Sequence, residues 1–188
     1  FIQSIFSIAI LIFSFGFFQA GNRALVLNTN RQKAKEYYGA ELVITGGIFI
    51  VMSVSLILYA LFDHNIKEKQ LNVFLLFLIP FGWVFLLQRY FEVLFQADNQ
   101  IKKLSQVRLY PTLGFLFTAA LVYFIFMDSE INKLVVIWTF YIATQIVVYL
   151  FVVIKLEVSF KNIRTRLNEI WNYNKSYGFN VYLGSLFG

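Results

Sequence analysis

The sequence predicts an all-α integral membrane protein, a polytopic bundle of helices, and three observations support this class. Hydrophobic residues make up 59% of the chain and charged residues 14%, whereas a soluble domain has about 45–50% and about 25%. The apolar residues gather in long charge-free runs. Those runs do not alternate polar and apolar positions as barrel strands do, so in lipid they are expected to be helices, which pair their own backbone groups.

The runs are long enough to cross a bilayer, which takes roughly 20 apolar residues. Residues 1–155 are expected to hold five transmembrane helices, at about 1–22, 42–62, 70–91, 109–127 and 134–154. Residues 156–175 are expected to form an amphipathic linker, and 176–188 to begin another apolar helix that the end of the sequence truncates. The sequence is therefore expected to be a segment of a longer membrane protein.

The basic residues predict the orientation. Counted after successive runs, Lys and Arg number 4, 2, 4, 1 and 5, so one side carries 13 of the 16. An excess of Lys and Arg marks the cytoplasmic side of a membrane. Residues 23–38, 96–108 and 155–175 are therefore expected in the cytoplasm, and the short loops DHNIKEKQ and DSEINK outside.

The linker LEVSFKNIRTRLNEIWN has the pattern of an amphipathic helix. Its apolar residues recur at helical spacing: Phe160, Ile163, Leu167 and Ile170. The basic residues fall mainly off that stripe: Lys161, Arg164 and Arg166. The pattern predicts a helix on the anionic inner leaflet, acting as an anchor for the bundle or as a contact for a lipid head group.

Composition also excludes several kinds of site. The chain has no cysteine and a single histidine, His64, in a charged loop, so we expect no disulfide, no metal site and no catalytic residues. The net charge of +6 is attributed to the membrane orientation rather than to nucleic-acid binding.

Three stretches carry a resemblance to a known family. In FGFFQAGNRALVLNTNRQKAKEYY an apolar helix closes with Gly21, Arg23 and Ala24, and LLQRYFEVLFQADNQIKKLSQVRLYPTLGFLF is a long helix, a basic loop and a return into the membrane. The third stretch is KSYGFNVYLGSLFG. Together the three stretches resemble the polysaccharide and O-antigen flippases of the multidrug/oligosaccharidyl-lipid/polysaccharide (MOP) exporter superfamily, although the third lacks a proline that the family often has at the entry into its seventh helix. The resemblance runs from about the family's second helix to the start of its seventh.

The resemblance implies that the chain is most of the N-terminal lobe of a MOP-type transporter in the bacterial cytoplasmic (inner) membrane. Such a flippase is no enzyme. It moves undecaprenyl-diphosphate-linked oligosaccharide from the cytoplasmic to the outer leaflet by alternating access, for cell-surface polysaccharide and lipopolysaccharide O-antigen synthesis. The implied partners are this lipid-linked oligosaccharide, the lipid bilayer and other polysaccharide-assembly membrane proteins, with no nucleic acid. No cofactor is implied, and H+ or Na+ coupling is left open.

A flippase needs a polar, cation-bearing cavity among its apolar helices. Arg89, Glu92 and Gln96 fall on one helical face, and Gln88 pairs with Glu92 four residues on. One interpretation gives Arg89 a diphosphate contact through its forked donors. The other makes Arg89 and Glu92 an ion pair at the cytoplasmic interface, since the helix has already spanned the bilayer near Gln88.

A second group of candidates closes the first run. Gln19 and Arg23 are one turn apart, with Asn22 beside them, while Gly16 and Gly21 allow close helix approach. Arg23 is either an anchor at the cytoplasmic end or a residue that attracts the diphosphate.

Three further positions are singled out. Gln145, midway along the run 134–154, predicts an interhelical hydrogen bond or a sugar contact. Glu41 is expected to begin its helix, where a carboxylate suits the helix dipole, with proton coupling as the other interpretation. Pro80 and Gly82 lie mid-span and predict a kink that could act as a hinge.

Other functions compete with the flippase. A cation-coupled multidrug exporter of the same superfamily would favour acidic residues deep in the bundle, and the sequence places all ten carboxylates in loops or near helix ends. A membrane polysaccharide polymerase or glycosyltransferase usually needs larger loops or clustered carboxylates. A purely structural membrane subunit is also compatible with the spans.

Overall fold

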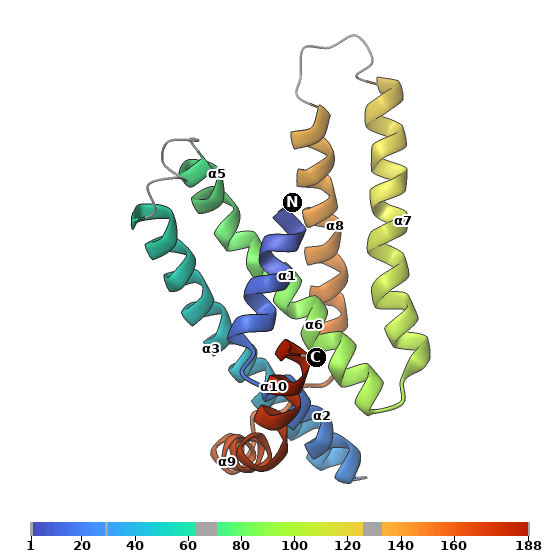
Figure 1. Cartoon of the computed structure of the whole chain (residues 1–188). Coiled ribbons are helices and arrows are strands. Elements are labelled where there is room, and N and C mark those ends of the chain that lie inside the picture. The colour runs from blue at the N-terminus through green and yellow to red at the C-terminus, as the bar shows by residue number, and fades with distance from the viewer. Residues whose placement is uncertain (1, 29, 63–70, 126–132, 188) are drawn as a thin grey trace.

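The structure, a computed structural model, describes residues 2–28, 30–62, 71–125 and 133–187, and within these ranges all regular secondary structure is helical. The helices are α1 (Ile2–Phe13), α2 (Phe17–Leu27), α3 (Arg31–Phe62), α5 (Leu71–Leu78), the 3-10 turn η1 (Ile79–Phe81), α6 (Gly82–Ala97), α7 (Ile101–Ile125), α8 (Lys133–Lys155), α9 (Ile163–Tyr173), the π-helical segment η2 (Asn174–Gly178) and α10 (Phe179–Phe187). As Figure 1 shows, α7 and α8 form an antiparallel hairpin beside the other helices, and α9 lies across the lower end of the bundle.

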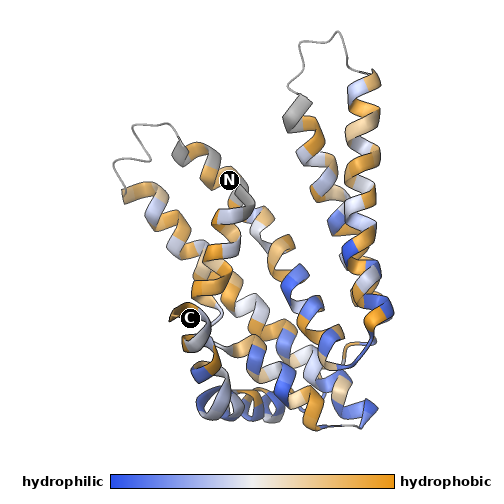
Figure 2. Ribbon diagram, turned by 45° about the vertical axis from the view of Figure 1, so that its right-hand side comes forward, coloured by the Kyte–Doolittle hydropathy of each residue, from blue (hydrophilic) through white to orange (hydrophobic). Residues whose placement is uncertain are grey.

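Four helical stretches are long and apolar enough to cross a membrane: Arg31–Phe62, Leu75–Ala97, Ile101–Phe124 and Val136–Lys155. The pair formed by α1 and α2 would add a fifth span, although it is bent by 68° at a short break. Their outer faces carry many exposed apolar side chains, and Figure 2 shows these hydrophobic residues along the upper parts of the helices. The prediction of an all-helical bundle with several apolar helices of membrane-spanning length is confirmed at this coarse level.

The helix bounds differ from the expected ones wherever a helix continues past its apolar run. The third helix begins at Arg31 rather than near residue 42. Likewise, α7 begins at Ile101, and this places Pro111 inside the helix. Charged residues are compatible with a helix that projects beyond the lipid, so a search for charge-free runs finds the apolar part and misses the projecting turns.

The first run is two helices rather than one helix over residues 1–22, with a sharp turn at Ser14, Phe15 and Gly16. Both Phe15 and Gly16 have positive φ, 44° and 81°, and this left-handed conformation is costly for a phenylalanine. A Cβ on Gly16 would lie 2.4 Å from the Gly178 carbonyl group. Glycine at position 16 therefore permits both the turn and the contact with η2.

The backbone groups freed by this turn find partners inside the protein. The Ser14 amide donates to the Ile10 carbonyl at 3.0 Å, and the Ser14 hydroxyl donates to the Leu11 carbonyl at 3.1 Å. The Ile12 carbonyl accepts a hydrogen bond of 2.8 Å from the hydroxyl of Tyr182 on α10. An interrupted helix is tolerated at membrane depth only where the protein itself satisfies such groups.

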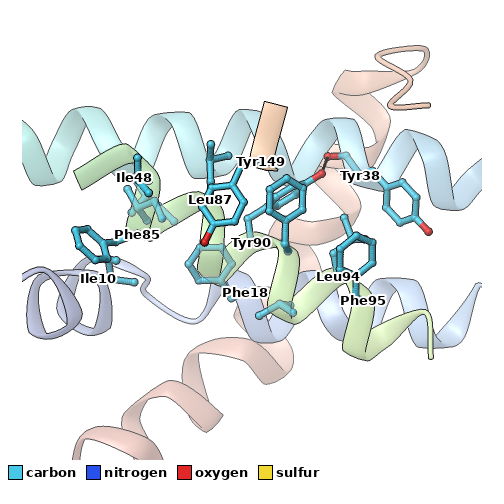
Figure 3. Packing of buried hydrophobic residues seen from close by; sticks show 14 of the residues in the cluster. Ile10, Phe18, Tyr38, Ile48, Phe85, Leu87, Tyr90, Leu94, Phe95 and Tyr149 are labelled. Atoms are coloured by element: carbon cyan, nitrogen blue, oxygen red, sulfur yellow. Dashed lines mark hydrogen bonds between the residues drawn. The ribbon is translucent and has the colours of Figure 1, made fainter. Parts of the chain in front are cut away.

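The core is built around α6, which is buried along most of its length. Figure 3 shows Phe85, Tyr90 and Phe95 of this helix between α3 on one side and α1 and α2 on the other. Tyr149 of α8 joins the cluster, with its ring 5.4 Å from that of Phe91. Close aromatic packing of this kind fixes α6 as the central element against which the other helices are positioned.

The three basic segments, 23–38, 96–108 and 155–175, lie at the same end of the bundle, the lower end in Figure 1. Hydrophilic residues concentrate at that end in Figure 2. The loops expected on the opposite side fall largely in 63–70 and 126–132, outside the described residues. The clustering agrees with the charge pattern, while the membrane and the side that this end faces stay predictions.

The expected kink at Pro80 and Gly82 coincides with η1, the 3-10 turn between α5 and α6. Gly82 is packed tightly: a Cβ there would lie 2.7 Å from the ring of Phe6 and 3.1 Å from the methyl group of Met52. Gly82 therefore lets α1 and α3 approach the start of α6. Whether η1 acts as a hinge stays a prediction.

Candidate functional site

A pocket of about 360 Å³ with both apolar and polar walls lies between the break in the first run and α6. Its polar lining comes from two places: Ser7, Ser14 and Gln19 of α1, the turn and α2, and Gln88, Arg89 and Glu92 of α6. The α6 residues share one face because Gln88 and Arg89 each lie about one helical turn before Glu92. The pocket thus brings together four of the residues singled out from the sequence: Gln19, Gln88, Arg89 and Glu92.

The predicted ion pair between Arg89 and Glu92 is present but is not the closest one. The Arg89 guanidinium is 3.7 Å from the Glu92 carboxylate, whereas Nε of Arg108 on α7 donates a hydrogen bond of 3.0 Å to the same carboxylate. Gln88 adds a long contact of 3.5 Å. Because Arg108 holds Glu92, the Arg89 side chain, 48% exposed, keeps its donors available to the pocket.

Spacing along the chain did not predict the contact with Arg108, which lies 16 residues beyond Glu92. A signal was present in the topology: α6 and α7 are joined by a short turn, so the last turns of α6 and the first turns of α7 are neighbours. An acidic residue on α6 and a basic one on α7 then fall at the same level of the hairpin. The interfacial position expected for the pair fits this exposed, basic end.

The remaining sequence candidates lie apart from the pocket. Arg23 is exposed and stacks over the Tyr177 ring at 4.3 Å, and Asn22 beside it is half-buried. Gln96 is exposed near the end of α6. Gln145 is 2% exposed on α8; its amide interacts with the Tyr141 hydroxyl one turn earlier, and its Oε1 has no hydrogen-bond partner among the described residues.

Gln19 shares that property with Gln145. Its Oε1 is buried and has no hydrogen-bond partner within the described ranges. A buried amide oxygen without a partner is an unsatisfied hydrogen-bond acceptor, and this one lies in the wall of the pocket rather than open to it. The group that the pocket itself offers to a ligand is the partly exposed cation of Arg89.

Glu41 is the site residue that sequence reasoning misjudged. It was expected to cap a helix, but α3 begins ten residues earlier and Glu41 is only 3% exposed. Both of its carboxylate oxygens lack hydrogen-bond partners in the described part of the chain. A Cβ on Gly21 would lie 2.0 Å from its Oε1, so the carboxyl group lies against α2 exactly where glycine leaves room for it.

The neighbours of Glu41 are also buried. Thr45 donates a hydrogen bond of 2.7 Å to the Glu41 backbone carbonyl, and the Tyr90 hydroxyl donates one of 3.0 Å to the Tyr38 carbonyl. None of these bonds reaches the carboxyl group. The expectation that all carboxylates lie in loops or near helix ends was therefore wrong, because it assumed that α3 begins at its apolar run.

A second polar cluster joins α9 to α3. Arg166, 9% exposed, donates hydrogen bonds of 2.8 Å to Glu36 and of 2.7 Å to Glu169. Asn162 also donates to Glu36, and Tyr37 donates to Glu169. The predicted apolar stripe of α9 is buried in part: Ile170 is inside and Phe160 is exposed. Arg166 was expected away from the buried face of the helix, but it lies in that face and forms this network.

The network has electrostatic consequences on α9. The hydrogen bonds that Arg166 donates to Glu36 and Glu169 raise the pKa of its guanidinium. Burial opposes ionisation of Glu169, yet hydrogen bonds from Tyr37 and Arg166 outweigh it and hold the pKa of that carboxyl below its ordinary value. Arg166 and Glu169 of α9 and Glu36 of α3 are therefore charged at neutral pH. Their ion pairs hold α9 to α3, and α9 also packs against α2.

Comparisons of the chain with protein-family models, with curated proteins and with solved structures found no match. The chemistry of the pocket between the break and α6 is accordingly inferred from its own residues. It offers an arginine, a carboxylate that Arg108 holds, amide groups and hydroxyl groups beside an apolar bundle. The arginine suits an anionic group, and the amide and hydroxyl groups suit a hydroxyl-rich ligand.

Proposed function

We propose that this chain forms most of the N-terminal lobe of a lipid-linked oligosaccharide flippase, as its resemblance to the MOP superfamily implies. The observation that carries the proposal is the pocket in which Arg89 is left available while Arg108 holds Glu92. Across the pocket from Arg89, the break at Ser14 to Gly16 divides the first apolar run into two helices. Broken helices of this kind line the substrate sites of many transporters.

The pocket suits the chemistry of such a substrate. A diphosphate and its sugars cannot cross lipid alone, because removing charged and hydroxyl groups from water is very costly. An arginine meets a phosphate with paired donors, and the Gln19 and Gln88 amides suit sugar hydroxyl groups. The polyprenyl tail would stay against the apolar outer faces of the helices.

The test uses the complete gene, deleted in its native host, and measures which leaflet holds the polyprenyl-linked oligosaccharide. Deletion is expected to leave it on the cytoplasmic face. The wild-type gene and Arg164→Ala, which removes an exposed arginine of α9, should restore transfer, whereas Arg89→Ala should not. Normal surface polysaccharide after deletion would refute the proposal. Restoration by Arg89→Ala would refute the role of this pocket.

A second candidate, a cation-coupled multidrug exporter of the same superfamily, is favoured by one specific observation. Glu41 is a buried carboxyl group without a hydrogen-bond partner among the described residues, packed against Gly21 of α2. An ionised carboxylate is very costly in such a place, so this packing favours the protonated form. Movement of α2 away from α3 would admit water and release the proton, as a proton-coupled exporter requires.

Drug susceptibility separates the two candidates. An exporter predicts that deletion causes drug sensitivity with normal surface polysaccharide, and that Glu41→Gln fails to restore resistance. Glu157→Gln is the matched control, because it neutralises an exposed carboxylate that is paired with Lys35. Unchanged drug susceptibility in the deletion strain would refute the exporter.

A further inference from the structure

Two adjoining pockets lie at the basic end of the bundle, away from the pocket that holds Arg89. The first is an apolar groove of about 480 Å³ between α7 and α8, walled by aromatic and aliphatic side chains such as Phe95, Val148 and Phe151. The second is a polar pocket of about 570 Å³ between the start of α3, the turn after α6 and the end of α8. Both are lined by Lys103, Lys155 and Leu156, so the groove and the polar pocket meet at two lysines.

The polar pocket carries an excess of positive charge. Its lining contains four basic side chains, Arg31, Lys35, Lys103 and Lys155, and two acidic ones, Asp98 and Glu157, so its net charge is 4 − 2 = +2.

Both carboxylates already have partners. Asp98 accepts a hydrogen bond of 2.6 Å from the Tyr38 hydroxyl, and Glu157 pairs with Lys35. The hydrogen bond from Lys35 holds the pKa of Glu157 below its ordinary value. Among the described residues, Lys103 and Lys155 have no acidic partner within ion-pair distance.

The two lysines are positioned by rings at the mouth of the groove. The ammonium group of Lys155 lies 4.3 Å from the centre of the Phe151 ring, and that of Lys103 lies 5.8 Å from the centre of the Phe95 ring. Lysine stems pack on apolar surface while their charged ends reach water. The ammonium groups therefore mark the boundary at which an apolar groove becomes a cationic pocket.

We propose that these two pockets form a binding site for an anionic phospholipid of the surrounding bilayer. Its phosphate lies between Lys103 and Lys155, its polar head group extends into the polar pocket, and one acyl chain occupies the groove between α7 and α8. Charge complementarity favours an anionic head group. The outer faces of α7 and α8 are apolar and exposed, so the groove opens to bilayer lipid, which is present in large excess.

The test measures lipid binding to the purified full-length protein in detergent by native mass spectrometry, with phosphatidylglycerol as the probe. The double variant Lys103→Gln/Lys155→Gln is expected to bind it about 25-fold more weakly, since a lysine near an anionic surface contributes roughly fivefold. The control Lys102→Gln/Lys161→Gln removes the same charge from exposed positions that line neither pocket and should bind as the wild type does.

A third variant tests the groove. Val148→Trp places a large side chain in the apolar groove and leaves both lysines intact, so it should also weaken binding of phosphatidylglycerol by several fold. A lipid-free melting temperature within the range of the wild type shows that each variant is folded. A circular dichroism spectrum supplies the same check if that melting temperature is lowered.

Three results would overturn the proposal. The first is binding of zwitterionic phosphatidylcholine as tight as that of phosphatidylglycerol, which would remove the role of the lysines. The second is a change in phosphatidylglycerol binding that does not follow the site. Either the control pair weakens binding as much as the double lysine variant does, or Val148→Trp does not weaken it. The third is displacement of phosphatidylglycerol by an equal concentration of undecaprenyl phosphate, which would assign the site to the polyprenyl carrier instead.

Discussion

Replacing Arg166 by methionine should destabilise the protein strongly, and the structure allows the size to be worked out. Arg166 Nε lies 2.8 Å from the Glu36 carboxylate, and the two side chains are 11% and 6% exposed. At an effective dielectric constant of about 20, their attraction is about 6 kcal/mol. After partial hydration of the stranded carboxylate, the expected loss is about 3–5 kcal/mol, the usual cost of leaving one buried partner alone.

The double variant Glu36→Gln/Arg166→Met separates charge from packing. This variant leaves no buried charge without a partner, so it should recover most of the loss. The remaining acidic partner, Glu169, has a side chain that is 36% exposed and can be hydrated. The exposed Arg164→Met is the control and should change stability by about 0.5 kcal/mol or less. The assay is unfolding of the detergent-purified protein by SDS titration, followed by circular dichroism. Equal destabilisation by the single and the double variant would refute the argument from the stranded charge.

Three other predictions concern contacts between helices. Gly21→Ala should lower the melting temperature, because its Cβ would lie 2.0 Å from Glu41 Oε1, and adding Glu41→Ala should restore it; a single variant as stable as the wild type would contradict this contact. Tyr182→Phe removes the donor to the Ile12 carbonyl and should cost about 1–3 kcal/mol in an unfolding titration, whereas no change would mean that the carbonyl has another partner. The folded-state pKa of Glu169 is lowered, so its contribution to stability is fully present above its ordinary value of 4.5 and is lost as the pH falls through the folded value. The melting temperature of the wild type should therefore fall more steeply on acidification than that of Glu169→Gln, and parallel curves would contradict the shift.

The positions of the apolar helices were predictable because lipid imposes one simple requirement, a long run of apolar residues that bonds its own backbone. Where the chain projects beyond the lipid, that requirement no longer applies. This is why the polar turns of α3 before residue 42 were missed, and with them the burial of Glu41. A helix that begins ten residues earlier turns an expected capping residue into an interior one.

The candidate site was predictable in part for a similar reason. Helical periodicity on α6 brought Arg89 and Glu92 to one face, and the structure keeps them there. Periodicity within a helix gives no information about which neighbouring helix faces it, so the pairing of Glu92 with Arg108 and the approach of Gln19 could not be read from spacing. The burial of Arg166 was missed for the same reason, since its acidic partner Glu36 lies 130 residues earlier in the chain.

The hydrogen bond between Tyr182 and Ile12 bears on the order in which the chain is assembled during synthesis. Tyr182 follows Ile12 by 170 positions. The first helix therefore leaves the ribosome well before Tyr182 is made. Until α10 is inserted, the Ile12 carbonyl has no hydroxyl donor, and a continuous helix through residues 14–16 satisfies more backbone groups in lipid than the bent one does. The bend is therefore expected to form late, when α10 docks. The pocket beside the break would then be completed only after a segment that is made 170 positions after Ile12.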